Sequence, residues 1–117
     1  MVIVKLLNKF NALDGSGEWS FQIEDRVFSG KEYDTSFNRL EILSAIKCLE
    51  FLVETKEVLI IGQSRYLISG GQNFLKTWEK DNWTTKQGYP LKNQDLWAEL
   101  ADLCRAHNKV SFVFREK

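Results

Sequence analysis

Residues 58–68, VLIIGQSRYLI, leave few choices of local structure. Four consecutive apolar residues, Val58–Ile61, predict a buried strand, and Gly62 ends it before a helix that begins near Ser64. In an open α/β sheet, the carboxyl end of a strand that leads into a helix is a favoured position for binding and catalytic groups. The residue at this junction is Gln63, whose amide does not ionise near neutral pH and binds divalent cations poorly. The junction therefore predicts an α/β fold with an uncharged amide at a position where catalysis or metal binding would favour a charged side chain.

The rest of the sequence predicts a single domain, residues 1–117, with the element order β-β-β-α-β-α-α-β. This order implies a five-stranded mixed sheet, with a three-strand antiparallel meander followed by two parallel strands that helices connect. The expected strands are residues 2–10, 17–25, 26–33, 57–61 and 110–117. The expected helical segments are residues 38–55, with an apolar stripe through Ile42, Leu43, Ile46, Leu49 and Val53, residues 63–80, broken or kinked at Gly70 and Gly71, and residues 93–107.

Composition sets limits on location and on partners. Sixteen basic residues balance sixteen acidic ones, so any binding to nucleic acid or to a membrane has to come from a local patch. Cys48 and Cys104 lie on or beside apolar helical stripes, which indicates buried thiols in a reducing compartment. The N-terminal sequence MVIVKLLNKF is too short and too interrupted by lysine for a signal peptide or a membrane span. We expect a cytoplasmic protein.

Three segments resemble parts of one known family. Residues 74–97, FLKTWEKDNWTTKQGYPLKNQDLW, resemble the helix and basic protrusion with which ribonuclease H1 enzymes of bacteria and eukaryotes grip an RNA–DNA hybrid. NRLEI (38–42) is similar to the helix-opening segment that carries the family's catalytic glutamate, here at Glu41. QSRYLISG (63–70) resembles the family's Asp-Ser-x-Tyr-x-x-x-Gly, with Gln63 replacing the aspartate. The resemblance implies the ribonuclease H type 1 fold, without the family's final helix. The residues that match the protrusion in spacing are Trp78, Trp83, Pro90, Lys92, Asn93, Asp95, Leu96 and Trp97.

The resemblance also implies which positions would hold metal. The family hydrolyses phosphodiesters with two Mg²⁺ ions, roughly 3.5–4 Å apart, which a cluster of carboxylates holds. The four carboxylate positions fall on Asn8, Glu41, Gln63 and a residue beyond Lys117, so Glu41 alone is retained. One carboxylate does not hold two ions, which predicts no metal, no cofactor and no hydrolysis. A competing alignment places the first position at Asp14, in DGS, and still leaves two carboxylates at most. Glu41 itself has a simpler role open to it, as a solvated carboxylate in the first turn of a helix.

Other residues match positions with which the family binds its hybrid. The resemblance implies that Ser36 and Asn38 contact 2′-hydroxyls of the RNA strand and that lysines contact phosphates. Glu79 and Asp81 interleave with those lysines, which weakens the positive potential. The tryptophans have an alternative role as a small core between helices and loop. The predicted nucleic-acid-binding residues are Ser36, Asn38, Lys76, Lys80, Trp83, Lys86, Lys92 and Asn93.

Three functions stay open at this point. The leading hypothesis is a catalytically inactive RNase H-like domain kept for weak binding of an RNA–DNA hybrid or duplex, for binding a protein, or for both. The second hypothesis is a genuine hybrid ribonuclease that uses Mg²⁺ and takes its missing carboxylates from another subunit. The third is a structural or assembly protein that pairs through its sheet.

A sheet face without a helix motivates a predicted protein interface. VIVKLL and VSFVF are apolar on both faces, so we expect an exposed patch larger than the few hundred Å² that a soluble monomer tolerates. A homodimer or a protein partner would cover this patch; alternatively, the second and third strands or the terminus fold over it. Which face pairs is left open. The predicted interface residues are Val4, Leu6, Phe112 and Phe114.

Overall fold

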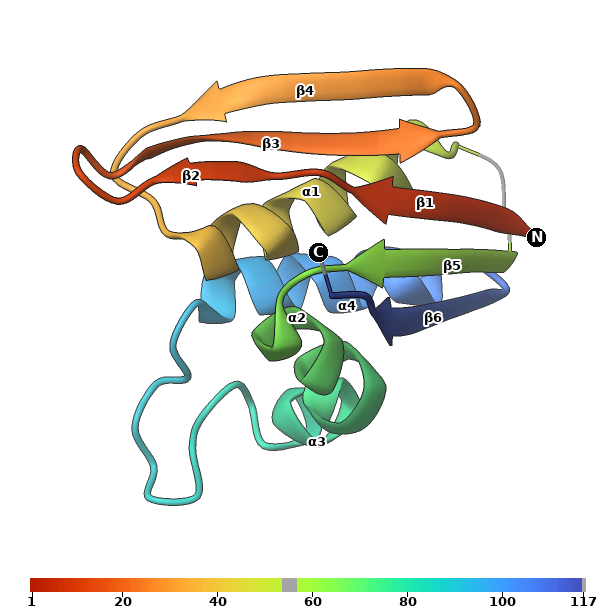
Figure 1. Ribbon diagram of the computed structural model, residues 1–117. Helices are drawn as coiled ribbons and strands as arrows, with labels where there is room; N and C mark the ends of the chain where they lie inside the picture. Colours follow the sequence, from red (N-terminus) through yellow and green to blue (C-terminus); the bar gives the residue numbers. More distant parts are fainter. Residues whose placement is uncertain (54–56, 117) are drawn as a thin grey trace.

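A six-stranded mixed sheet forms the centre of the protein (Figure 1). The computed structural model describes residues 1–53 and 57–116. Within the sheet, β3 and β4 are antiparallel neighbours, β1 is antiparallel to β3 and parallel to β5, and β5 is parallel to β6. The predicted α/β class, with an antiparallel meander and two later parallel strands, is confirmed. The strands are β1 (Val2–Leu6), β2 (Lys9–Asn11), β3 (Ser16–Ile23), β4 (Arg26–Glu32), β5 (Glu57–Gly62) and β6 (Lys109–Phe114).

The expected first strand, residues 2–10, is divided in two, which is why the sheet has six strands instead of five. β1 and β2 pair with β3 in one continuous register, with Leu6 opposite Phe21 and Lys9 opposite Glu18. Between them, Asn8 Oδ1 accepts the backbone N–H of Ser20 at 2.7 Å. The Asn8 side chain thus replaces a backbone carbonyl as an acceptor in the ladder with β3. The first strand is interrupted at Asn8 because this side chain also makes other contacts.

The helical segments agree with the predicted order but differ at their ends. They are α1 (Phe37–Phe51), α2 (Arg65–Ser69), the π-helical turn η1 (Gly70–Phe74), α3 (Leu75–Lys80) and α4 (Gln94–Arg105). α1 ends before the predicted limit at residue 55: the backbone N–H of Leu52 bonds to Cys48 O in an irregular conformation. Val53 is 91% exposed, so its predicted place on the apolar stripe is wrong. Residues 54–56 lie outside the described residues. No helix in the described part of the chain is long and apolar enough to span a bilayer.

The predicted break at Gly70 and Gly71 is a π-helical turn between α2 and α3. A Cβ atom on Gly70 would lie 2.4 Å from the ring of Trp97, and one on Gly71 would lie 2.6 Å from the ring of Phe112. Both rings are buried, so neither can move aside cheaply. The two glycines therefore let α4 and β6 pack directly against the backbone of this turn.

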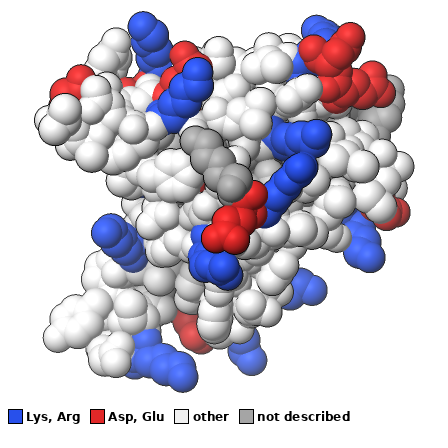
Figure 2. Space-filling model, viewed as in Figure 1, with Lys and Arg blue, Asp and Glu red and all other residues white. Residues whose placement is uncertain are grey.

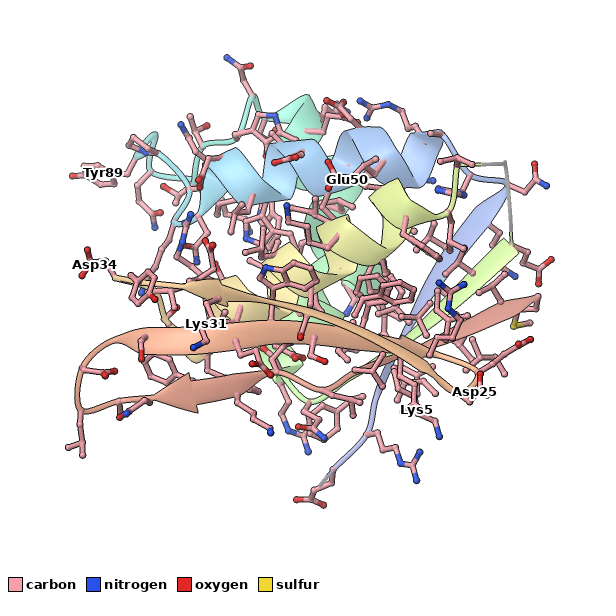
Figure 3. All side chains as sticks on the ribbon, turned by 90° about the horizontal axis from the view of Figure 1, so that it is seen from above. Lys5, Asp25, Lys31, Asp34, Glu50 and Tyr89 are labelled. Atoms are coloured by element: carbon pink, nitrogen blue, oxygen red, sulfur yellow. The ribbon has the colours of Figure 1, made fainter. Side chains whose placement is uncertain are left out.

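Two helices cover one face of the sheet. In Figure 3, α1 and α4 lie on the same side, and the labelled Lys5 points to the other side. Side chains alternate between the faces of a strand, so one parity of β1, β5 and β6 enters the core. Val4, Leu6 and Phe112 have this parity and are 0%, 1% and 4% exposed.

The predicted interface residues Val4, Leu6 and Phe112 are therefore wrong, because these side chains are buried under the helices. Phe114 has the same parity and is only partly exposed. The opposite parity forms the face that no described helix covers. We call this the open face. Its apolar residues on β1, β5, β6 and just after β1 are Ile3, Leu7, Leu59, Ile61 and Val113, and Val27 of β4 lies on the same face.

Candidate functional site

The carboxylate of Glu41 lies where α1 meets the first strands and the β5–α2 junction. Its side chain is fully buried. Oε1 accepts hydrogen bonds from the backbone N–H groups of Gln63 (2.9 Å) and Ser64 (3.0 Å), and Oε2 accepts one from Asn8 Nδ2. Gly62 permits this approach, since a Cβ there would lie 3.0 Å from Oε1. The expectation of a solvated Glu41 is wrong, and both of its oxygens are occupied by the chain's own N–H groups.

Asn8 is the other half of this network and is also buried. Its Nδ2 donates to Glu41 Oε2 and to Ser44 Oγ (2.8 Å), while its Oδ1 accepts from Ser20 N. Both amide hydrogens are therefore used. An asparagine suits this position because Glu41 needs a donor here, and an aspartate would present a second acceptor.

Asp14 lies elsewhere, in the exposed turn between β2 and β3. Its carboxylate accepts from the N–H (2.9 Å) and the hydroxyl (2.6 Å) of Ser16, and these bonds lower its pKa. This is an ordinary turn role for aspartate. Of the two first-strand candidates, the structure brings Asn8, and not Asp14, to Glu41.

A pocket of about 560 Å³ opens beside the Glu41 network. Two amide residues, Asn8 and Gln63, line it, and Glu41 does not. The other lining residues are Lys9, Phe10, Phe37, Phe114 and Glu116. Among residues 1–53 and 57–116, no group of three or more His, Cys, Asp or Glu side chains is placed to hold a metal ion.

Three of the predicted nucleic-acid-binding residues make internal contacts. Ser36 caps α1, because its hydroxyl accepts the backbone N–H of Arg39 at 3.1 Å. Asn38 Oδ1 accepts from the hydroxyl of Ser64 at 2.9 Å. Asn93, at the start of α4, accepts from Arg39 Nη1 (2.8 Å) and donates to the hydroxyl of Tyr66 (3.2 Å). Asn38 and Asn93 thus join α1, α2 and α4, and all three side chains have less hydrogen-bonding capacity left for a ligand.

The remaining predicted residues lie on α3 and the loop that follows it, residues 81–93. The loop projects from the body of the protein (Figure 1), and Tyr89 lies at its far end (Figure 3). Trp83 is partly buried against the core, which fits the alternative role foreseen for it. All four predicted lysines are exposed: Lys76, Lys80, Lys86 and Lys92.

Sequence reasoning missed two polar contacts that hold this site together. Ser64 donates its hydroxyl to Asn38 and also accepts from Leu67 N at 3.2 Å as the cap of α2. Arg39 pairs with Asp95 at 2.9 Å and so links the starts of α1 and α4. The spacing from Ser64 to Leu67 is a recognisable capping signal, whereas no local pattern predicts the pairing of Arg39 with Asp95.

Comparisons with known proteins bear directly on this architecture. The family model described as RNase H matches residues 10–114. A ribonuclease H of Novosphingobium aromaticivorans is 34% identical over 104 residues, which cover 86% of this chain and 72% of that protein. The chain belongs to the RNase H family. A ribonuclease H of Francisella philomiragia is 38% identical over 98 residues, which cover 80% of this chain and 64% of that protein. The present chain therefore spans about two thirds of the length of the curated RNase H relatives that it matches.

Solved RNase H structures share the fold at lower identity. LC9-RNase H1, described as a type 1 RNase H with the type 2 active-site motif, superposes with a TM-score of 0.77 at 20% identity, over 99% of this chain and 64% of that one. A foamy viral protease-reverse transcriptase in complex with an RNA/DNA hybrid superposes with a TM-score of 0.76 at 15% identity, over 98% of this chain and 17% of that one.

The metal pair that the RNase H family uses does not fit these residues. Mg²⁺ prefers anionic oxygen ligands, but the pocket presents the amides of Asn8 and Gln63. The carboxylate of Glu41 is buried behind them, and its oxygens already accept three N–H groups. An ion at Glu41 would have to displace the Asn8 amide. The described residues thus form a hydrogen-bonded junction in place of a two-metal centre.

Burial makes the protonation of Glu41 sensitive to folding. Desolvation raises the pKa of Glu41 above its usual value of 4.5, against the opposing effect of the N–H groups of Gln63, Asn8 and Ser64. Because the pKa is higher in the folded chain, the folded state binds this proton more tightly than the unfolded state does. The ionised form therefore lowers stability, and this penalty develops as the pH rises from 4.5 through the pKa of the folded chain.

We predict that Glu41→Gln removes this pH dependence. In the unaltered chain, the free energy of unfolding should fall as the pH rises through that window and level off above it. The variant should lack this decline, although its Nε2 would face the Asn8 donor and lower stability by roughly 1–3 kcal/mol at every pH. Urea denaturation at a series of pH values measures both effects. Glu50→Gln, at an exposed position of the same helix, is the matched control and should keep the decline. Parallel profiles for Glu41→Gln and the unaltered chain would contradict a titrating Glu41.

Proposed function

We propose that this RNase H domain binds an RNA–DNA hybrid without cleaving it. The observation that supports this proposal most directly concerns the carboxylate of Glu41. Both of its oxygens already accept hydrogen bonds from within the chain, from Asn8 Nδ2 and from the backbone N–H groups of Gln63 and Ser64. Two-metal hydrolysis needs anionic ligands on both ions, and the pocket offers two amides instead.

The loop after α3 supports the binding half of the proposal. Its lysines and those of α3 are exposed, and Lys86 and Lys92 flank the exposed Tyr89 on the projecting loop. Glu79 and Asp81 lie among them, although Glu79 is paired with Arg105. A related fold, the foamy viral reverse transcriptase, is described in complex with an RNA/DNA hybrid. We infer phosphate contacts from the lysines, with few specific polar contacts because Ser36, Asn38 and Asn93 bond internally.

The first prediction from this proposal concerns cleavage. The purified chain should not cleave a labelled RNA–DNA hybrid above background in Mg²⁺ or Mn²⁺. A double variant, Asn8→Asp with Gln63→Asp, returns two carboxylates to the pocket beside Glu41. Mn²⁺ should raise the melting temperature of this variant and leave that of the unaltered chain unchanged, because a ligand stabilises the state that binds it. Metal-dependent cleavage by the unaltered chain would contradict the proposal and favour a ribonuclease completed by another subunit.

The second prediction concerns binding. Affinity for the hybrid should be modest and should fall roughly 100-fold between about 50 and 200 mM salt if four lysines contact phosphates. Lys86→Glu with Lys92→Glu should abolish detectable binding in a band-shift titration. Lys31→Glu with Lys109→Glu makes the same change in net charge at exposed sheet positions and should leave binding nearly intact. Equal losses in the two double variants, or no binding at low salt, would remove the proposed interface.

The open face favours a second role, self-association. Ile3 and Val113 are 49% and 43% exposed on this face, beside the half-buried Leu7, Leu59 and Ile61. Figure 2 shows charged side chains of both signs across the middle of this face as well as at its edges. Arg115 and Glu116 line a shallow pocket on it together with Leu7 and Ile61. The meander half carries Lys5, Glu18 and Lys31 on the same face, so a copy related by a two-fold axis can bring opposite charges together beside the apolar residues. We propose a second copy as the occupant, since burial of apolar area contributes about 25 cal/mol per Å² before association costs.

Light scattering across a micromolar concentration range checks this role. A dimer should appear at twice the 13.6 kDa chain mass. Ile61→Lys, among the apolar residues of β1, β5 and β6 on the open face, should shift the population to monomer. Val27→Lys should do so much less, because Val27 is an exposed residue of β4, which β1 and β3 separate from β5 on the same face. A 13.6 kDa species at all concentrations would exclude the homodimer.

A further inference from the structure

Three phenylalanines meet at the pocket beside Gln63 without belonging to one segment. Phe10 comes from β2, Phe37 begins α1, and Phe114 ends β6. All three rings are partly exposed. Phe10 and Phe37 lie outside the hydrophobic core cluster, whereas Phe21, Phe28 and other aromatic residues stack within or against it. Among the ring contacts of the described residues, none joins the three pocket rings to one another. Phe10 and Phe37 thus offer aromatic surface that internal stacking does not use, whereas the ring of Phe114 is stacked by the Arg65 guanidinium.

The two amides of this pocket differ in what they have left to bind. Asn8 uses both hydrogens and its oxygen within the chain. The Gln63 backbone N–H bonds to Glu41, but its side-chain amide has no hydrogen-bond partner among the described residues. Gln63 therefore presents one donor pair and one acceptor at an aromatic wall, and its backbone is fixed by the buried carboxylate.

The lining of the pocket carries one charge of each sign, and a further cation lies close by. Lys9 and Glu116 line the pocket. The guanidinium of Arg65 lies 4.0 Å from the ring centre of Phe114 and brings a second cation to the same wall. Flat aromatic surface, a free amide and nearby cations together match a nucleotide, because bases stack on aromatic rings and a glutamine amide can pair with the edge of adenine.

We propose that this pocket binds an unpaired nucleobase of a single strand, with adenine the best match to the Gln63 amide. This site would add to the proposed nucleic-acid binding, on which the inference rests, and its residues differ from those of the lysine-bearing loop. Phe10 and Phe37 supply stacking surface, Gln63 reads the base edge, and Lys9 and Arg65 attract the phosphates. The volume of about 560 Å³ lies within the range of small-ligand sites.

Fluorescence anisotropy with a labelled ten-nucleotide oligoadenylate tests this pocket. The reference ligand is an abasic oligomer of the same length and charge. We expect the oligoadenylate to bind roughly 5- to 100-fold more tightly, as base stacking on an aromatic platform implies. Equal affinities would mean phosphate attraction alone and would overturn the proposal.

Two conservative variants assign the effect to the pocket. Phe37→Leu keeps an apolar side chain but removes the flat ring, and Gln63→Leu keeps the size but removes the amide. Both should lower oligoadenylate affinity toward the abasic value while their melting temperatures stay close to that of the unaltered chain. Phe51→Leu removes an aromatic ring that is 42% exposed away from the pocket, and it should leave affinity unchanged. Unchanged affinity in both Phe37→Leu and Gln63→Leu would also overturn the proposal.

The same assay separates this inference from the hybrid interface. Lys86→Glu with Lys92→Glu should lose the hybrid and keep the preference for oligoadenylate over the abasic oligomer. Gln63→Leu should show the reverse pattern. If the unaltered chain binds oligoadenylate selectively but no hybrid, the pocket stands and the loop interface fails.

Discussion

The buried carboxylate of Glu41 holds together three parts of this fold that are distant in sequence. It fixes the start of α2 through the N–H groups of Gln63 and Ser64, and it fixes the break between β1 and β2 through Asn8. A buried charge is tolerated only where hydrogen bonds replace its hydration, and here three N–H groups do so. This arrangement explains why the first strand is interrupted and why Gly62 precedes the junction. It also leaves the amide of Asn8 where a metal-dependent enzyme would need a cation.

Much of the fold follows from local sequence patterns. The apolar run Val58–Ile61, the helical periodicity of α1 and α4, and the glycines at positions 70 and 71 all correspond to elements of the structure. The errors arise where tertiary contacts decide. Asn8 breaks the first strand because its side chain replaces a backbone acceptor, and no periodicity signals that. The interface prediction failed on parity: strands that are apolar on both faces do not show which face the helices cover, and Val4, Leu6 and Phe112 are on the covered one.

The site was predicted in part by the same reasoning. Sequence brought Asn8, Glu41 and Gln63 together as matching positions, and in the structure they are hydrogen-bonded neighbours. It did not foresee that Glu41 is inaccessible, because burial depends on how α1 packs against the strands. Nor did it foresee that Asn38 and Asn93 join helices to one another. The aromatic wall of the pocket was missed because Phe10, Phe37 and Phe114 come from three separate segments and share no motif.

The central claim is that the Asn8 amide occupies the place of a cation beside Glu41. The most direct measurement is an anomalous difference map from crystals of the unaltered chain grown with Mn²⁺ at millimolar concentration. The account predicts no anomalous peak within bonding distance of Glu41 and a hydrogen bond from Asn8 Nδ2 to Glu41 Oε2. A Mn²⁺ peak bound to Glu41, with the Asn8 side chain turned away, would contradict it.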